Sequence, residues 1–348
     1  MLSFSEKYMH RCLELASLGI GNTAPNPMVG SVIVYDDKII GEGFHQQYGK
    51  PHAEVNAINS VKDKELLKRS TIYVNLEPCS HFGKTPPCAD FIIENKIPNV
   101  VIGTPDVNEV VCQNGIKKLF DVGCNVKVGV LEKECRELNK RFFTFHEKKR
   151  PFILLKWAQT SDGFIDRIRT SSDKSPANIS DKFHRILTHK WRSEEQAIMV
   201  GTQTALLDNP KLNTRQWTGN NPTRIVIDRT LRLPKNLNLF DGSIPTLIFT
   251  EIKNAESTTN KEFINIDFDE NWLEQMLTIL HKRKIQSIMV EGGSMLLNTF
   301  IQKNLWDEAG VFTSKIKFHN GIKAPTLIGN YIKREIIDGN IHEVIVPC

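Results

Sequence analysis

The sequence predicts an α/β protein built from two domains, and two observations lead to this expectation. A chain of 348 residues is long for one compact core. Short runs rich in β-branched residues alternate with stretches of helical periodicity, an order typical of a sheet covered by helices on both faces. The alternation pauses at the polar run HEKKRP, residues 146–151, and then begins again. We therefore expect one domain over residues 1–146 and a second over residues 150–348.

Local signals place the elements of the first half. Apolar residues recur at helical spacing over residues 3–18, and Gly19 ends that helix. Asp36 and Asp37 separate two β-rich runs and predict a hairpin. The same criteria give strands at 29–35, 38–44, 70–76, 100–103 and 125–130, and helices at 3–18, from 53 onward, 88–95, 114–121 and 132–145.

The second half repeats the alternation of strands and helices. Ser180 is the expected cap of its first helix. A later strand runs directly into Gly292 and Gly293, and a helix follows at once. The expected strands are 152–158, 197–201, 224–228, 246–249 and 287–291, and the expected helices are 180–192, 271–282 and one that ends at 302.

Four residues of the first half form a pattern typical of a catalytic zinc site. Glu54 follows His52 by two residues, and Cys79 and Cys88 come later, each directly after a proline. A catalytic zinc takes three protein ligands and leaves its fourth position for water. One imidazole and two thiolates also balance the charge of Zn²⁺. We therefore expect these three residues to bind zinc and Glu54 to carry a proton to a leaving amine, as in zinc deaminases.

Two other interpretations stay open at this point. The cysteine pair alone would also suit a structural zinc clip in a binding module, where the metal would have four protein ligands. A nucleic-acid deaminase with an accessory domain would need a basic groove with stacking aromatic residues. The net charge of +5 is spread through the chain and no such stripe is visible, so we expect no nucleic-acid partner.

The apolar runs, the N-terminal stretch and the cysteine content together indicate the cellular compartment of the protein. No apolar run approaches the eighteen or so residues of a membrane span, and the N-terminal stretch lacks the apolar middle of a signal peptide. The seven cysteines are odd in number and mostly scattered, which favours a metal site in a reducing compartment over a disulfide framework. We expect a cytoplasmic protein with no membrane partner.

Four motifs of the first half resemble the deaminase half of the bifunctional riboflavin-biosynthesis deaminase–reductase family. They are PNPMVG at 25–30, GEGFH at 41–45, HAE at 52–54 and EPCSHFGKTPPC at 77–88. The wide cysteine spacing separates that family from cytidine and tRNA-adenosine deaminases. The resemblance implies a cytidine-deaminase-like α/β/α sandwich with zinc on His52, Cys79 and Cys88, and with Glu54 as proton shuttle. It also implies pyrimidine contacts from Asn26, His45, His81 and Lys84.

The second half lacks GxGxxG but contains three clusters with polar or glycine-rich chemistry, at 155–165, 192–215 and 290–300. In the last, free backbone N–H groups at the helix start, after two glycines, suit the phosphates of a cofactor. Arg192 and Arg215 offer bidentate donors for a phosphate. Together these clusters outline a pocket for two anionic ligands.

The same three clusters are similar to the reductase half of that family, whose fold is dihydrofolate-reductase-like. The resemblance implies substrate contacts from Ser175, Arg192, Leu212, Arg215 and Glu291. It implies NADPH contacts from Ala158, Thr204, Asp208, Gly293, Ser294, Met295, Leu296, Leu297, Asn298 and Thr299. In the family pattern, a Trp usually precedes the Ile-Ser/Thr pair before the first helix of this half. This chain has Asn178 at that position, so we do not expect the cofactor contact that the Trp would make.

The resemblance implies two consecutive steps of riboflavin biosynthesis. Zinc hydroxide would deaminate 2,5-diamino-6-(5-phosphoribosylamino)pyrimidin-4-one while Glu54 moves the protons. NADPH would then reduce the ribosyl chain of the product to ribityl. The expected partner is this phosphorylated pyrimidine, and a homo-oligomer, either dimer or tetramer, is expected.

Overall fold

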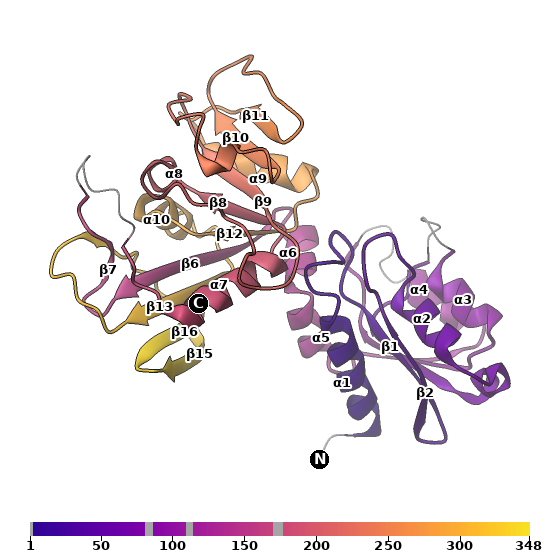
Figure 1. Ribbon diagram of the computed structural model, residues 1–348. Coiled ribbons are helices and arrows are strands. Elements are labelled where there is room, and N and C mark those ends of the chain that lie inside the picture. Colours follow the sequence, from indigo (N-terminus) through magenta and orange to yellow (C-terminus); the bar gives the residue numbers. More distant parts are fainter. Residues whose placement is uncertain (1–2, 81–85, 109–113, 170–176) are drawn as a thin grey trace. The chain divides into compact units, whose positions relative to one another are not determined.

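The computed structural model describes residues 3–80, 86–108, 114–169 and 177–348. The chain forms two compact units, Met1–Lys149 and Arg150–Cys348. Figure 1 draws the first unit in indigo to purple and the second in magenta to yellow. None of the helices in the described ranges is long and apolar enough to cross a membrane.

The first unit contains a five-stranded sheet with the order β2-β1-β3-β4-β5. The hairpin of β1 and β2 turns at Asp36 and Asp37, whose φ angles of 48° and 54° suit a two-residue type I′ turn. Strand β1 also pairs antiparallel with β3, whereas β3, β4 and β5 run parallel. The strands are β1 Gly30–Tyr35, β2 Lys38–Phe44, β3 Thr71–Leu76, β4 Asn99–Thr104 and β5 Asn125–Val128.

Helices cover both faces of this sheet, as the sequence predicts. The alternation of side chains along β1 sends Ile33 to one face and Val32 to the other. Ile33 belongs to the core under α2, α3 and α4, whereas Val32 belongs to the core under α1 and α5. The helices are α1 Phe4–Ser17, α2 Ala53–Ser60, α3 Cys88–Glu94, α4 Asn114–Asp121, α5 Glu132–Leu138 and α6 Lys140–Glu147, with a 3₁₀ helix at Lys64–Arg69.

The predicted single helix over 132–145 is wrong, because two helices meet at Asn139. This residue is almost fully buried, and its side chain bonds the backbone of Met28 twice. The Asn139 Oδ1 accepts from the Met28 N–H at 2.8 Å, and Nδ2 donates to the Met28 carbonyl at 2.9 Å. A tertiary contact therefore holds Asn139 outside helical geometry, with φ −99° and ψ 24°.

The second unit contains a nine-stranded sheet with the order β11-β10-β9-β8-β12-β6-β13-β16-β15. The pairs from β11 to β13 are parallel, and the last two pairs are antiparallel. The strands are β6 Phe152–Thr160, β8 Ala197–Val200, β9 Thr223–Ile227, β10 Thr246–Thr250, β11 Lys261–Asn265, β12 Ser287–Val290, β13 Glu308–Ser314, β15 Asn330–Ile337 and β16 Asn340–Val346. A separate two-stranded sheet joins β7 Phe164–Asp166 to β14 Ile322–Lys323.

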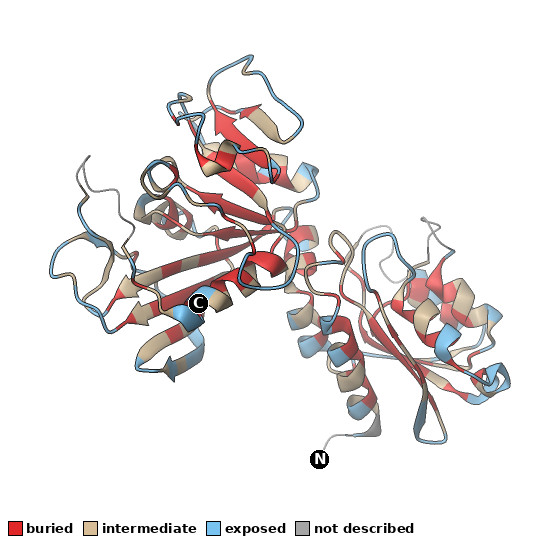
Figure 2. Cartoon of the chain, viewed as in Figure 1, coloured by how far each residue is buried: buried red, intermediate tan, exposed pale blue. Residues whose placement is uncertain are grey.

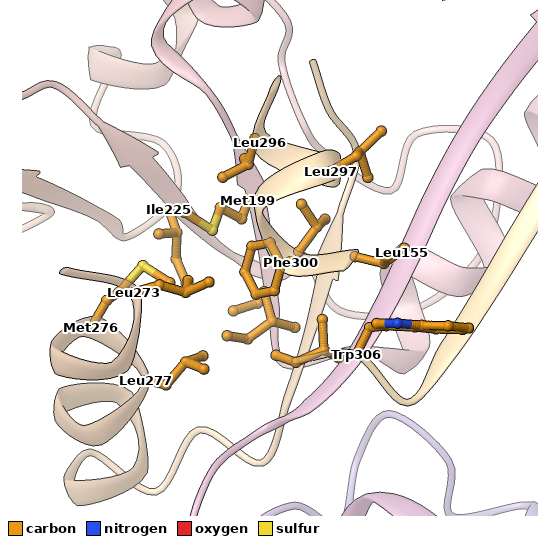
Figure 3. Close-up of a cluster of buried hydrophobic side chains, with 14 of the residues drawn as sticks. Leu155, Met199, Ile225, Leu273, Met276, Leu277, Leu296, Leu297, Phe300 and Trp306 are labelled. Atoms are coloured by element: carbon orange, nitrogen blue, oxygen red, sulfur yellow. The ribbon is translucent and has the colours of Figure 1, made fainter. Parts of the chain in front are cut away.

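The main core of the second unit lies between this sheet and two helices, α9 and α10. Figure 2 colours the strands of this sheet mostly as buried, and Figure 3 draws some of the core side chains. Phe300 at its centre is fully buried and Leu297 beside it is equally inaccessible. Met199 and Ile225 contribute from the strands beneath. The helices of the unit are α7 Lys182–Glu194, α8 Thr202–Asp208, α9 Trp272–Lys282 and α10 Ser294–Gln302, with a 3₁₀ helix at Asn238–Phe240.

Two predictions for the second unit need correction or extension. The cap of α7 is Asp181 and not Ser180, because the Asp181 carboxylate accepts from the His184 N–H at 2.8 Å. The pattern assigned no element to several segments that do form one: α8, β7, β11 and β13 to β16. Strand β15 is largely exposed, so it lacks the apolar run by which a buried strand is recognised.

Candidate functional site

Three potential metal ligands meet beyond the carboxyl end of β3. His52 directly precedes α2, Cys88 is the first residue of α3, and Cys79 lies in the segment between β3 and α3. The His52 Nδ1 lies 3.6 Å from the Cys79 Sγ and 3.3 Å from the Cys88 Sγ. All three ligand atoms lie within 4.8 Å of one another.

These separations fit one tetrahedral zinc ion. Zn–S bonds of about 2.3 Å and Zn–N bonds of about 2.0 Å place N and S ligands about 3.5 Å apart. The observed N···S distances of 3.6 and 3.3 Å bracket that value. Cys88 is buried, but His52 and Cys79 are partly exposed, so the group opens toward solvent on one side.

The pKa values of the two thiols move in opposite directions. The hydrogen bond with Cys88 lowers the pKa of Cys79 to about 4, and His52 assists. The same contact, together with burial, raises the pKa of Cys88 well above its usual range. The Cys88 backbone N–H also donates to the Cys79 Sγ at 3.3 Å. A divalent cation would hold both sulfurs as thiolates.

Glu54 is the second residue of α2 and is only 3 % exposed. Burial raises the pKa of its carboxyl to about 7, although the charge of His52 acts in the opposite direction. A carboxyl that titrates near neutral pH can both accept and return a proton. Its position beside the three ligands therefore suits proton transfer at the metal site.

The structure brings two of the predicted pyrimidine contacts, Asn26 and His45, to the same place. The His45 ring lies against the His52 ring, with centroids 5.2 Å apart. Its Nδ1 lies 3.1 Å from the Pro51 carbonyl, so it carries the proton and donates. The Nε2 then accepts from the Asn26 Nδ2 at 3.1 Å. His81 and Lys84 lie outside the described residues.

Two buried asparagines hold the segment that carries Asn26, and neither was identified from the sequence. Asn139 bonds both backbone groups of Met28, as described above. The Asn75 side chain in β3 accepts from the Gly30 N–H at 2.8 Å and donates to the Met28 carbonyl at 3.1 Å. The segment is therefore fixed by side chains far away in the sequence.

In the second unit, the predicted substrate residues Arg192 and Glu291 pair with each other. Arg192 lies on α7 and Glu291 follows β12. The guanidinium donates to both carboxylate oxygens at 2.8 and 2.7 Å, and its third donor reaches the Asn213 carbonyl at 3.2 Å. Burial opposes ionisation of Glu291, but Arg192 and Lys156 bring its pKa down to about 2. The Arg192 fork is thus directed at a carboxylate and is not left open for a phosphate.

Lys156 and His189 belong to the same cluster and were missed in the sequence. Lys156 lies on β6, and burial lowers the pKa of its ammonium despite the attraction of Glu291. His189 on α7 is 3 % exposed, and burial with the charges of Arg192 and Arg215 lowers its pKa to about 4. Lys156 lies within the cluster 155–165 but was not identified as a site residue, and His189 lies outside the three clusters that the sequence singled out. Only the tertiary fold brings them to the carboxylate.

The other predicted substrate residues differ in exposure. Arg215 is exposed and donates to the Asn213 side chain at 3.0 Å. The Leu212 side chain is 1 % exposed and packs in a core cluster, so only its backbone is available to a ligand. Ser175 lies outside the described residues. Asn178, at the position of the family's Trp, accepts a hydrogen bond from Arg185 at 3.0 Å.

Two of the predicted cofactor residues, Thr204 and Gly293, lie close together at the turn between β12 and α10. The Gly201 N–H donates to the Gly292 carbonyl at 2.8 Å, which holds the ends of β8 and β12 together. A Cβ on Gly293 would lie 3.2 Å from the Thr204 Oγ1, so Thr204 closes one side of this turn. Ala158 lies on β6, three residues beyond the position that pairs with Val290. The carboxyl ends of parallel strands form the usual ligand site of such sheets.

The remaining cofactor candidates lie in α8 and α10. Leu296 and Leu297 are core residues, so the cofactor contact that we propose for them is through the backbone. Met295 is 85 % exposed. Asp208 accepts from Arg169 at 2.6 Å. The Asn298 and Thr299 side chains donate to residues one turn earlier in α10, Ser294 and Met295. The Ser294 hydroxyl donates to the carbonyl of Lys323 on β14.

Two protein-family models match the chain. The model of the cytidine and deoxycytidylate deaminase zinc-binding region matches residues 2–104, which include His52, Cys79 and Cys88. The model of the RibD C-terminal domain matches residues 151–341. The two matches fall in different units of the structure.

Curated proteins and solved structures are similar over nearly the whole chain. Riboflavin biosynthesis protein RibD of Aquifex aeolicus is 40% identical over 314 residues, 88% of this chain and 86% of that protein. The protein of the same name from Bacillus amyloliquefaciens is 37% identical over 332 residues, 93% of this chain and 87% of its own. The diaminohydroxyphosphoribosylaminopyrimidine deaminase/5-amino-6-(5-phosphoribosylamino)uracil reductase of Thermotoga maritima has a TM-score of 0.90 and 38% identity, with 99% of each chain covered.

Proposed function

The chain belongs to the RibD family of riboflavin biosynthesis proteins, and on this premise we propose which of its residues perform the two reactions. It is a bifunctional enzyme with a zinc-dependent deaminase and an NADPH-dependent reductase. We assign the deaminase to residues 1–146 and the reductase to residues 150–348. The observation that supports the assignment best is the three-ligand group of His52, Cys79 and Cys88 with Glu54 beside it.

In the deaminase, His52, Cys79 and Cys88 would hold zinc, which supplies an activated water at neutral pH. Glu54 takes a proton from the attacking water and returns it to the amine of 2,5-diamino-6-(5-phosphoribosylamino)pyrimidin-4-one, which leaves as ammonia. Asn26 and His45 orient the ring of the pyrimidine, and the neutral tautomer of His45 follows from its bond to Pro51. His81 and Lys84 complete the substrate contacts in this proposal.

In the reductase, NADPH supplies the reducing equivalent. The bond between C1 and the ring oxygen of the ribosyl group breaks, so the ring oxygen needs a proton. Lys156 is the proposed donor, because burial lowers the pKa of its ammonium and its charge is balanced by Glu291. Glu291 positions Lys156 and accepts hydrogen bonds from ribosyl hydroxyls. Ser175, Arg215 and the backbone of Leu212 complete the substrate contacts in this proposal, and Arg192 contributes by holding the carboxylate of Glu291.

The turn at Gly293 would receive the cofactor through its backbone N–H groups. Free N–H groups at a helix start favour phosphate, and α10 begins directly after this glycine. Thr204, Asp208 and Ala158 line the same edge of the sheet in this proposal. We further propose a cytoplasmic enzyme that acts on a phosphorylated small molecule, binds no nucleic acid and forms a homo-oligomer, either dimer or tetramer.

One assay tests both activities. Purified protein receives the diaminopyrimidinone phosphate and NADPH, and ammonia release and the loss of nicotinamide absorbance are followed together. The proposal expects one ammonia for each NADPH oxidised, with ammonia first. Ammonia without NADPH oxidation would remove the reductase assignment, and absence of both would remove the proposed function.

A further inference from the structure

Glu77 lies between the sheet of the first unit and the metal ligand Cys79, and the proposed reactions do not use it. It directly follows β3, and only Pro78 separates it from Cys79. The residue is buried, with 4% of its surface exposed. A buried carboxylate is stable only where hydrogen bonds or charges replace its contacts with water. The partners of this carboxylate therefore indicate its role.

The carboxylate of Glu77 joins two segments that follow β4 in the chain. Its Oε2 accepts from the Asp106 N–H at 3.1 Å, just after β4. Its Oε1 accepts from the Gly115 N–H at 2.9 Å and from the Ile116 N–H at 3.2 Å. These are the second and third residues of α4, where backbone N–H groups have no partner within the helix. Glu77 thus caps α4 from a distant part of the chain, and its negative charge suits that end of the helix.

The start of α4 also touches the backbone beside Cys79. A Cβ on Gly115 would lie 2.0 Å from the Pro78 carbonyl oxygen, far closer than packed atoms come. Only glycine therefore lets the helix approach Pro78 this closely. The ring of Pro78 restricts its backbone, so a displacement of this residue is passed on to Cys79.

On its other side, Cys79 is held by α3. The Ala89 N–H donates to the Cys79 carbonyl at 3.1 Å, and the Cys88 N–H donates to its Sγ at 3.3 Å. The helices α3 and α4 are joined by the ion pair of Asp90 and Lys118. Cys79 itself lies in neither a helix nor a strand. Its sulfur is therefore held in place by its neighbours and not by regular secondary structure.

We propose that Glu77 is a positioning residue of the metal centre. By tying the start of α4 and the segment after β4 to the chain just before Cys79, it sets the position of that sulfur relative to His52 and Cys88. Metal–ligand distances must lie within about 0.2 Å of their ideal values, so a small displacement of one sulfur weakens binding. The inference rests on the proposed function only in the assignment of these three metal ligands.

A cap that only stabilises the fold would behave differently. Its loss would lower the free energy of unfolding and leave the metal affinity of the folded chain unchanged. Loss of a residue that orients a ligand typically lowers metal affinity by about 10- to 100-fold. The zinc dissociation constant of the folded chain therefore distinguishes the two roles.

Glu77→Gln tests the proposal with almost no change in side-chain volume. An amide has one acceptor oxygen and one NH₂ group, so in either orientation the NH₂ meets a backbone N–H that the carboxylate accepts. Zinc is removed from the full chain, and its dissociation constant is measured by competition with a chromogenic chelator. The constant should rise roughly tenfold or more. The absorption bands of the cobalt-substituted protein should also change, because they report the ligand geometry.

Asp228→Asn is the matched control in the second unit. Asp228 is 2% exposed, and its carboxylate likewise accepts two backbone N–H groups, from Arg232 and Leu233, each at 3.0 Å. This variant should lose stability because a buried amide replaces an acceptor. Its zinc dissociation constant should equal that of the wild type.

Gly115→Ala disturbs the same contact by another route. The added methyl group has no room against the Pro78 carbonyl, so the start of α4 or the segment that carries Pro78 must move. The carboxylate of Glu77 is unchanged in this variant, and zinc affinity should fall again. Far-UV circular dichroism of the metal-free chains shows that each variant is folded at the assay temperature.

The outcomes separate this inference from the proposed function. Equal zinc dissociation constants in the wild type, Glu77→Gln and Gly115→Ala would overturn the inference alone. An equal loss of zinc affinity in Asp228→Asn would also overturn it, because a general loss of stability would then explain the effect. A wild-type chain that binds no zinc would overturn the assignment of the metal ligands as well, and with it the proposed function.

Discussion

Arg192 on α7 and Glu291 after β12 form a bidentate ion pair, with Nε to Oε1 at 2.8 Å and Nη2 to Oε2 at 2.7 Å. The pair is mostly buried and joins two segments that are 99 residues apart in sequence. It fixes the carboxylate beside Lys156. The position of the proposed proton donor in the reductase therefore depends on this pair.

Glu291→Gln should lower the reductase turnover by about 100-fold and leave ammonia release unchanged. The amide keeps the volume but removes the negative charge that balances Lys156 and Arg192. Steady-state NADPH oxidation with the deaminated substrate measures the effect. Glu262→Gln, which breaks an exposed pair in the same unit, is the control and should retain full turnover. Normal turnover in Glu291→Gln would remove the carboxylate from the site.

Glu54→Gln should lower ammonia release by about 10² to 10⁴-fold, the usual contribution of a general acid–base residue. The amide is close in volume and cannot shuttle protons. Zinc content should stay at the wild-type level, because the three ligands are untouched. NADPH oxidation with the deaminated intermediate should also be unaffected. A variant that still deaminates at the wild-type rate would refute the role of Glu54.

Asn139→Ala should raise the KM of the deaminase for its substrate more than it lowers kcat. The change leaves the Met28 N–H without its side-chain acceptor and leaves the Met28 carbonyl with Asn75 as its one side-chain donor, which loosens the segment that carries Asn26. Loss of these buried bonds should also cost about 1–3 kcal/mol of unfolding free energy. Asn125→Ala, at an exposed asparagine of β5, is the control. An unchanged KM with lowered stability would limit Asn139 to a structural role.

Acid should destabilise the second unit through His189. Burial with Arg192 and Arg215 lowers the pKa of His189 to about 4, below its usual value near 6.5. The unfolded chain therefore binds more protons between pH 6.5 and 4, and stability is present above that window and lost as pH falls through it. Denaturant unfolding at pH 7.5 and pH 5 should show this loss, on the order of 1–3 kcal/mol.

His189→Gln should flatten that pH dependence, because the variant has no imidazole to protonate. The exposed His319→Gln is the matched control and should keep the wild-type slope. If His189→Gln loses as much stability between the two pH values as the wild type, another group is responsible.

Much of the fold could be predicted from local signals. The predicted fold class is confirmed, with a cytidine-deaminase-like first half and a RibD reductase second half. Buried strands such as β3 and β12 are short apolar runs bounded by polar or glycine residues, so their order along the chain is visible in sequence. The hairpin at Asp36 and Asp37 was also predictable from turn chemistry.

The site residues that could not be predicted from local sequence signals are those whose roles depend on long-range contacts. No local signal distinguishes Asn139 from other helix residues. Its role depends on a hydrogen bond between its side chain and Met28, which lies 111 positions away in the sequence. Lys156 and His189 gain their significance only from the charges that the fold places around them. The zinc ligands are different, because their residue types and spacing already limit the chemistry to a few possibilities.

Removal of the metal tests the central claim most directly. The full chain is stripped of zinc with a chelator, and both half-reactions are measured before and after zinc is returned. We predict that ammonia release disappears and recovers with one zinc per chain, while NADPH oxidation with the deaminated intermediate stays constant. Undiminished ammonia release from the zinc-free protein would contradict the account.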